Sequence, residues 1–183
     1  ASGTYTVTQT VTNGPCGATT SQTVNVFAEP TASIAGTDPS CNGLCDGSAN
    51  LTVNGGAGPY TYAWSNLSSN EDQVALCAAS YTVTVTDVNG CQVTASVTLT
   101  DPPALTLSTV GTNASCNGVC DGTATATPSG GTAPYTYAWD DPLFQTNATA
   151  TGLCDGLASV TVTDASGCTA TGYYNVTEPV AMT

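Results

Sequence analysis

The chain has 183 residues, 40% of them hydrophobic, and its 13 acidic residues with no lysine, arginine or histidine give a formal net charge of −13. A chain without cations cannot neutralise the phosphates of a nucleic acid or the surface of an anionic membrane, which excludes both as partners. No apolar run approaches the roughly 18 residues that a membrane-spanning helix needs.

Two copies of one sequence unit fill most of the chain. We expect the first copy at 31–101 and the second at 102–178, each closed by an acidic residue followed by proline. The segment 1–30 lines up with the last two strands of such a unit, and 179–183 resembles the start of another. The sequence therefore predicts a window of a longer array, in which short proline-stiffened joints hold the domains in a linear rod.

The strands can be predicted in chain order from the first copy. Apolar and polar residues alternate over 49–53, 60–64, 81–86 and 93–99, a period of two that is typical of half-buried antiparallel strands. A hairpin turn at Asn89–Gly90 is expected between the last two. Trp64 is expected on a central strand, filling the middle of a sandwich. The fold class predicted is all-β, with tandem immunoglobulin-like β-sandwich domains.

The second copy has smaller side chains at core positions. Ala126 stands where the first copy has Leu51, and Ala158 stands where it has Tyr81. We expect Tyr174 to refill part of the lost volume.

The chemistry of the cysteines decides between a metal site, a redox site and a structural role. The pair in each Cys-x3-Cys stretch has a spacing that zinc accepts, but Cys77 and Cys91 flank a strand about 30 Å long, so they cannot ligate one ion together. Redox catalysis is disfavoured because no cation lowers a thiol pKa. We therefore expect structural disulfides. The favoured pairs are Cys45–Cys77 and Cys120–Cys154.

Four further cysteines are left with open connectivity: Cys41, Cys91, Cys116 and Cys168. A second bond is either within a copy or between copies, for instance Cys168 to Cys41, and the spacing does not choose between these alternatives. Cys16 has no obvious partner in this sequence.

The sequence also offers candidates for a catalytic site and for a ligand-binding site. Glycoside hydrolysis needs two carboxylates, and the adjacent pairs Asp140–Asp141 and Glu71–Asp72 are candidates, but neighbours on a strand point to opposite faces. The usual nucleophile–base pairs require residue types that this chain lacks, so no enzyme activity is expected. Surface glycans are candidate ligands, because three aromatic residues that could bind them are expected to be exposed. These are Tyr5, Phe144 and Tyr173.

Calcium is the one cofactor that the sequence suggests. Unpaired carboxylates at the joints and strand ends supply the oxygen ligands that Ca²⁺ binds, although they also suit solvated turns. The candidate ligands are Glu29, Asp101, Glu178, Asp46 and Asp121, with Asp87 and Asp164 at strand ends.

The motif combination resembles a known family. Cys-Asn-Gly-x-Cys-Asp-Gly, then Gly-Gly-x-x-Pro-Tyr-Thr-Tyr-x-Trp, then Val-Thr-Val-Thr-Asp-x-x-Gly-Cys resembles the SprB-type repeat of large cell-surface adhesins in gliding Bacteroidota. The N-terminal segment 1–30 resembles the tail of a PKD-type domain. The resemblance implies export to the cell surface, no catalytic residue, and pairing of Cys41 with Cys91 beside Cys45 with Cys77.

These observations predict a structural role outside the cell. We expect a disulfide-stapled segment of a long surface adhesin or filament that serves adhesion, gliding or display. Its partners would be neighbouring copies of the repeat or filament subunits, with surface glycans as further candidates. The alternatives are a passive spacer, or a Ca²⁺- or glycan-binding module, in a secreted multidomain protein.

Overall fold

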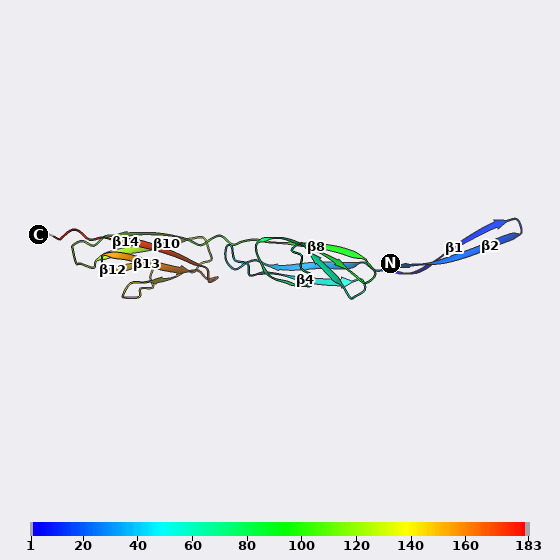
Figure 1. Ribbon diagram of the computed structural model, residues 1–183, viewed down its shortest axis with the longest axis horizontal. Helices are drawn as coiled ribbons and strands as arrows, with labels where there is room; N and C mark the ends of the chain where they lie inside the picture. Colours follow the sequence, from blue (N-terminus) through cyan, green and yellow to red (C-terminus); the bar gives the residue numbers. More distant parts are fainter. Residues whose placement is uncertain (1, 182–183) are drawn as a thin grey trace. The chain divides into compact units, whose positions relative to one another are not determined.

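The computed structural model describes residues 2–181, and all of the regular structure in that range is β (Figure 1). Within the same range no helix has the length and apolar character needed to cross a bilayer. The last two residues of the expected segment 179–183 lie outside the described residues. The strands are β1 (Gly3–Asn13), β2 (Cys16–Val26), β3 (Pro30–Thr37), β4 (Gly47–Gly55), β5 (Thr61–Trp64), β6 (Gln73–Leu76), β7 (Ala79–Thr86), β8 (Gln92–Leu99), β9 (Thr106–Thr112), β10 (Gly122–Ser129), β11 (Thr136–Trp139), β12 (Thr149–Leu153), β13 (Gly156–Thr163) and β14 (Thr169–Val176).

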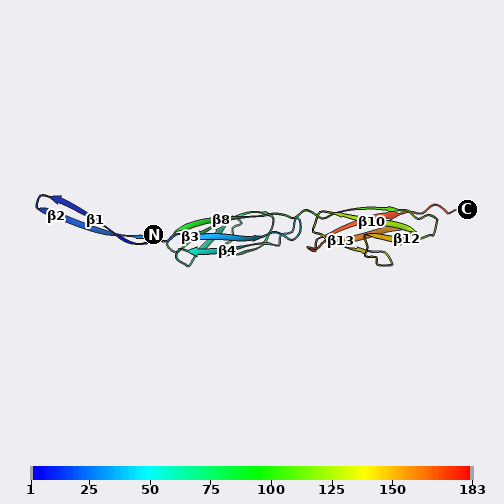
Figure 2. The same ribbon diagram turned by 180° about the vertical axis from the view of Figure 1, so that it is seen from behind.

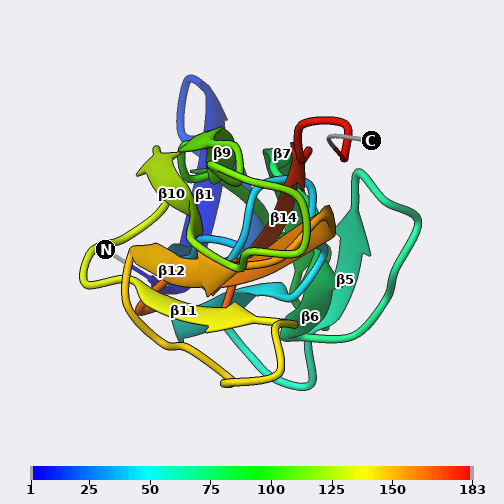
Figure 3. The same cartoon turned by 90° about the vertical axis from the view of Figure 1, so that its left-hand side faces the viewer.

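Each full repeat is a sandwich of two three-stranded antiparallel sheets. In the first repeat the sheets have the orders β3–β4–β6 and β5–β7–β8. Strands β3, β4 and β8 of this repeat are labelled in Figure 2. The second repeat has the same plan, with β9–β10–β12 and β11–β13–β14, so the consecutive strands β11 and β12 belong to different sheets. Both strands are labelled in Figure 3. The all-β sandwich predicted from the alternating pattern is confirmed.

The core of the first repeat follows from that alternation. Val83 and Val85 on β7 have no exposed area, whereas the threonines that alternate with them are exposed at Thr82 and partly exposed at Thr84 and Thr86. Trp64 is buried and its indole N–H donates to the carbonyl of Asn70. It lies on β5, however, which pairs only with β7 and is an edge strand, so the expectation of a central strand is wrong. The buried apolar residues of this core are Ala49, Leu51, Trp64, Leu76, Val83, Val85 and Leu99.

The second repeat fills its core with a different distribution of volume. Ala126 is buried where the first repeat has Leu51, and Ala158 faces Tyr174 across the β13–β14 ladder. The Tyr174 ring packs on the core and lies so close to Gly111 that a Cβ there would be 2.7 Å from the ring. The packing therefore confirms the expectation that Tyr174 fills part of the core volume that the smaller side chains of this repeat leave.

Residues 3–26 form one long hairpin, β1 paired with β2 from Gly3↔Val26 to Asn13↔Cys16. Every residue of both strands is exposed. Two strands are what the sequence predicts for the segment 1–30, and its origin as the tail of a PKD-type domain stays a prediction.

The chain divides into two compact units whose bounds differ from the sequence repeats at one loop. The first unit comprises 1–37 and 47–99, and the second comprises 38–46 and 100–183. The loop 38–46 thus comes from the sequence of the first repeat but lies in the second compact unit.

Candidate functional site

The recurring stretch Cys-Asn-Gly-x-Cys-Asp forms the same loop in both repeats, here named the CNG loop (41–46 and 116–121). Asp46 closes the first loop, because its carboxylate accepts the backbone N–H of Ser40 at 2.9 Å and the Ser40 hydroxyl at 2.5 Å. Asp121 holds Ser115 in the same way, at 2.8 and 2.5 Å. The serine hydroxyl and then the serine N–H lower the pKa of each aspartate.

The chain path inside the two CNG loops is also the same. The N–H of Leu44 donates to the carbonyl of Cys41 at 3.0 Å, and that of Val119 donates to Cys116 at 3.2 Å. Both loops use a glycine in the left-handed region, with φ of 75° at Gly43 and 74° at Gly118.

The β7–β8 and β13–β14 connections form a second matched pair, here named the acidic turns (87–91 and 164–168). Asp87 accepts the N–H of Cys91 at 2.8 Å, of Asn89 at 2.9 Å and of Ala57 at 3.1 Å. Burial acts to raise the pKa of Asp87, but these three N–H donors outweigh it and the pKa is lowered.

Asp164 repeats this arrangement in the second repeat. It accepts from Thr132 at 2.8 Å and from Ser166 and Cys168 at 2.9 Å. The Thr132 N–H makes the largest contribution to lowering its pKa. The predicted hairpin turn is present, and each acidic turn presents its cysteine at its C-terminal end.

Two disulfides have defined partners in the structure. Cys120 is bonded to Cys154, the pair that the sequence favours, with the Cα atoms 4.0 Å apart. Cys41 is bonded to Cys168 with the Cα atoms 5.6 Å apart. This bond lies in the second compact unit and joins the CNG loop of the first sequence repeat to the acidic turn of the second. Cys45 and Cys77 are disulfide-bonded as well.

The pairing of Cys41 with Cys91 that the resemblance implies is wrong, since Cys91 and Cys116 are free thiols. The reason is the length of β3. Gly56 lies against both Pro30 and Asp87, so the first acidic turn is at the end of the repeat where β3 begins. β3 is eight residues long, which is ~26 Å at 3.3 Å per residue, and Cys41 comes after its far end. Of the alternatives left open by the sequence, the bond between copies is the one present.

A cavity of about 370 Å³ lies beside the Cys41–Cys168 bond in the second compact unit. Leu44 of the CNG loop, Leu105 and Thr169 line it together with both cysteines. In the same unit the Asn42 side-chain amide donates to the carbonyl of Pro102 at 3.1 Å. The CNG loop is therefore held by a side-chain hydrogen bond as well as by the bridge.

The acidic residues proposed for calcium have hydrogen-bond partners or lie apart. Glu178 accepts from Asn117 and from the N–H of Gly118, while Asp46 and Asp121 close their own loops. Glu29 and Asp101 are exposed. Among residues 2–181 no three potential metal-ligating side chains gather into one group. Calcium binding at these positions stays a prediction from the sequence.

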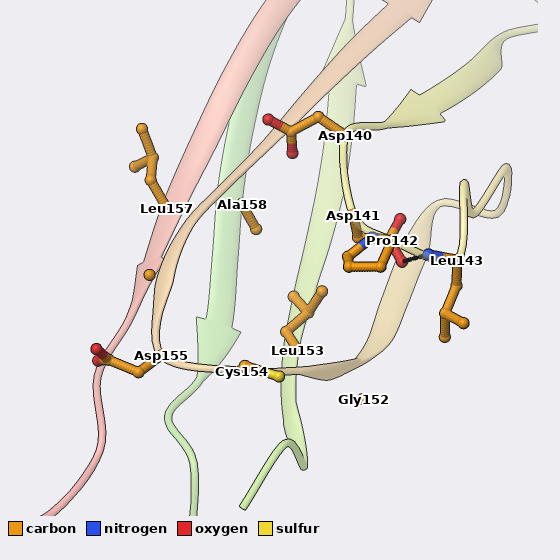
Figure 4. Close-up of a pocket in the computed structure, with 11 residues that line it drawn as sticks. Asp140, Asp141, Pro142, Leu143, Gly152, Leu153, Cys154, Asp155, Leu157 and Ala158 are labelled. Atoms are coloured by element: carbon orange, nitrogen blue, oxygen red, sulfur yellow. Dashed lines mark hydrogen bonds between the residues drawn. The ribbon is translucent and has the colours of Figure 1, made fainter. Parts of the chain in front are cut away.

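A second cavity, of about 420 Å³, contains the carboxylate pair considered for hydrolysis (Figure 4). Asp141 is buried and accepts from the N–H of Leu143 and from both the N–H and the side-chain amide of Gln145. Burial acts to raise its pKa, but these donors lower it overall. Asp140 accepts the N–H of Ser159 at 2.7 Å. Asp141 therefore shapes the β11–β12 connection, and Asp140 ties the start of that connection to β13. Asp72 likewise supports β4 by accepting the N–H of Leu51.

The aromatic residues considered for glycan binding are exposed, as expected. Tyr5 lies on β1, Phe144 in the β11–β12 connection and Tyr173 on β14. Phe144 is 79% exposed and is not one of the residues that line the second cavity. Glycan binding stays a prediction.

Comparisons with known proteins bear on the repeats. The family model described as the SprB repeat matches residues 33–69 and 108–144. A solved structure, the crystal structure of isoform 1.30.30 of Down Syndrome Cell Adhesion Molecule with its N-terminal eight Ig domains, is similar at 14% identity and a TM-score of 0.48. That similarity covers 97% of this chain and 28% of the other. A comparison with curated proteins gives no match. Both matches to the family model contain a Cys-Asn-Gly-x-Cys-Asp stretch and a Trp strand, so the family model supports SprB-type repeats at two places in the chain.

Proposed function

We propose that this chain is a structural segment of a long extracellular adhesin or filament on the cell surface, where stapled repeats support adhesion, gliding or display. The bond between Cys41 and Cys168 is the observation that carries the proposal. It ties two SprB-type repeats covalently to each other, which suits a molecule that must hold its modules together under stress.

Chemistry supports the location and the non-catalytic role. Disulfides persist in oxidising environments such as the cell surface and are rare in a reducing cytosol. The chain has no histidine, lysine or arginine, and the carboxylates of the second cavity are engaged by backbone N–H groups. Each of these features favours a mechanical role over a chemical one.

Labelling of intact source cells tests the location. Antibodies raised against the chain should stain cells that have not been permeabilised, and brief chymotrypsin treatment should remove the stain. Chymotrypsin is used because trypsin finds no lysine or arginine. A cytosolic protein followed in the same cells is the control. Staining that appears only after permeabilisation contradicts a surface location.

The passive-spacer alternative is tested by function-blocking antibody fragments. Monovalent fragments bound to the repeats should reduce attachment or gliding of the cells if the repeats take part in contact. Fragments that bind fully without changing either behaviour assign the repeats to spacing alone.

A further inference from the structure

Cys91 and Cys116 are the two free thiols of the full repeats, and each has a bonded counterpart elsewhere in the described chain. Cys116 stands where Cys41 stands, 75 residues earlier, and Cys91 stands where Cys168 stands, 77 residues later. The counterparts are bonded to each other. The free pair therefore consists of one residue of each type that makes the bridge.

The local structure around each free thiol is already that of its bonded counterpart. Cys116 lies in a CNG loop closed by Asp121, with Gly118 at φ 74°, as Cys41 lies in one closed by Asp46. Asn117 donates to the carbonyl of Pro179 as Asn42 donates to that of Pro102. Nothing in the CNG loop has to rearrange to present Cys116 in the way that Cys41 is presented.

Cys91 is presented in the same way as Cys168. Its N–H donates to Asp87 at 2.8 Å, and the N–H of Asp87 donates back to the carbonyl of Cys91 at 3.0 Å. The matching bonds between Cys168 and Asp164 are both 2.9 Å. The acidic turn holds its cysteine in this position whether or not the cysteine is bonded.

We propose that Cys91 and Cys116 are half-bridges for further SprB-type repeats. Cys116 bonds the acidic-turn cysteine of a following repeat, and Cys91 bonds the CNG-loop cysteine of a preceding one. The partner is a repeat of this same kind, in the same polypeptide or in a second copy. Successive repeats are then linked by a continuous series of disulfides of the Cys41–Cys168 type.

The chemistry of the step is a two-electron oxidation. Two thiols lose two protons and two electrons and form one S–S bond, while a small-molecule disulfide accepts the electrons and is reduced to two thiols. Burial, and next the nearby carboxylates of Asp87 and Glu29, raise the pKa of Cys91. The thiol therefore stays protonated at neutral pH, which is the behaviour of a structural cysteine rather than of a catalytic one.

The test uses the full chain with C16S, since Cys16 aligns with Cys91 and would compete for the same partner. The protein is held at about 1 mM, the effective concentration that a short linker supplies, in a buffer of oxidised and reduced glutathione. We expect a ladder of dimers, trimers and larger species on a non-reducing gel. Peptide mapping of a mixture of ¹⁴N- and ¹⁵N-labelled chains should find Cys91 of one chain bonded to Cys116 of another.

Matched variants identify which cysteine of one chain bonds to which cysteine of another. C91S and C116S, each added to C16S, should separately remove the ladder, and a one-to-one mixture of the two should form a heterodimer and stop there. Equal yields of like pairs, Cys91–Cys91 and Cys116–Cys116, would overturn the inference. A Cys91–Cys116 bond within one chain, or monomer throughout with Cys41–Cys168 and Cys120–Cys154 intact, would overturn it too.

The inference rests on the proposed function only for the oxidising surroundings, which the redox buffer supplies. Its failure is therefore distinguishable from failure of the proposed function. A chain that cross-links correctly but is found inside the cell keeps the disulfide chemistry and loses the surface role. A chain that is found on the cell surface but whose Cys91 and Cys116 never form disulfides keeps the surface role and loses the inference about the bridges.

Discussion

Single aspartates do in this protein what ion pairs do in others. With no cationic side chain available, Asp46, Asp87, Asp121 and Asp164 are each held by N–H or O–H donors of a loop or turn. Hydrogen bonds to the charged form favour that form, which is why all four have lowered pKa values. The sequence placed these residues in turns, but it also offered them as calcium ligands, because loop closure and metal binding need the same oxygen atoms.

Replacing Asp164 by Asn should destabilise the second repeat. The Asp164 carboxylate is buried and accepts three backbone N–H groups with two oxygens, whereas an amide offers one acceptor and leaves some of these donors unpaired. We expect the D164N substitution to lower the melting temperature by several degrees in calorimetry. The control is D155N, which makes the same chemical change at an exposed position and should leave the melting temperature unchanged.

The difference between wild type and D164N should depend on pH with a definite sign. The folded-state pKa of Asp164 is below the ordinary aspartate value of 3.8, so its contribution to stability is fully present above that value. The contribution is lost as the pH falls through the lowered folded-state pKa. The difference in melting temperature should therefore be constant from neutral pH to about pH 5 and shrink below pH 4. A difference that grows on acidification would contradict this assignment.

Among the structural elements, the strands were predictable and their connections were only partly so. The alternation of Val83 and Val85 with threonine marks β7 with its buried face, because side chains alternate across a strand. The same alternation cannot tell an edge strand from a central one. This is why the prediction that Trp64 lies on a central strand was wrong. The partner of Cys41 could not be derived from spacing either, since it depends on the packing of the loop 38–46 in the second compact unit.

Removing the Cys120–Cys154 bond should measure how much one disulfide contributes to the free energy of unfolding. Its two cysteines are 34 residues apart in sequence, and the chain-entropy model gives a stabilisation of about 4 kcal/mol for a loop of this size. The C120S/C154S variant should therefore lose about that much free energy of unfolding in urea titrations followed by Trp fluorescence. C116S is the control, because it removes a cysteine that is free in this chain. A loss equal to that of C116S would show that packing alone stabilises the repeat.

At the scale of the whole molecule, the charge is of one sign. Thirteen acidic residues without a cation repel one another, and no attractive side-chain ion pair exists for salt to weaken. The linear arrangement expected from the sequence stays a prediction, because proline at the joints constrains the chain only locally. What composition does determine is the response of the molecule to ionic strength.

Salt should stabilise this protein over a range in which it often has little effect on others. Raising NaCl from about 10 mM to about 500 mM shortens the screening length from roughly 30 Å to under 5 Å, so repulsion in the folded state falls. We expect the melting temperature to rise by a few degrees and then level off. Potassium bromide at equal ionic strength is the control, and it should give the same rise if screening is the cause. A fall in melting temperature with either salt would contradict a repulsive molecule.

The Cys41–Cys168 bridge also decides how far the chain can be stretched. If the polypeptide is pulled from its two ends, tension enters at Cys41, crosses two sulfur atoms and leaves at Cys168. The sequence separation of 127 residues between them, roughly 400 Å of extended backbone, is never drawn out even after both sandwiches have lost their structure. A fibre built in this way would be nearly inextensible under load, and a single backbone cut between the two cysteines would not break it.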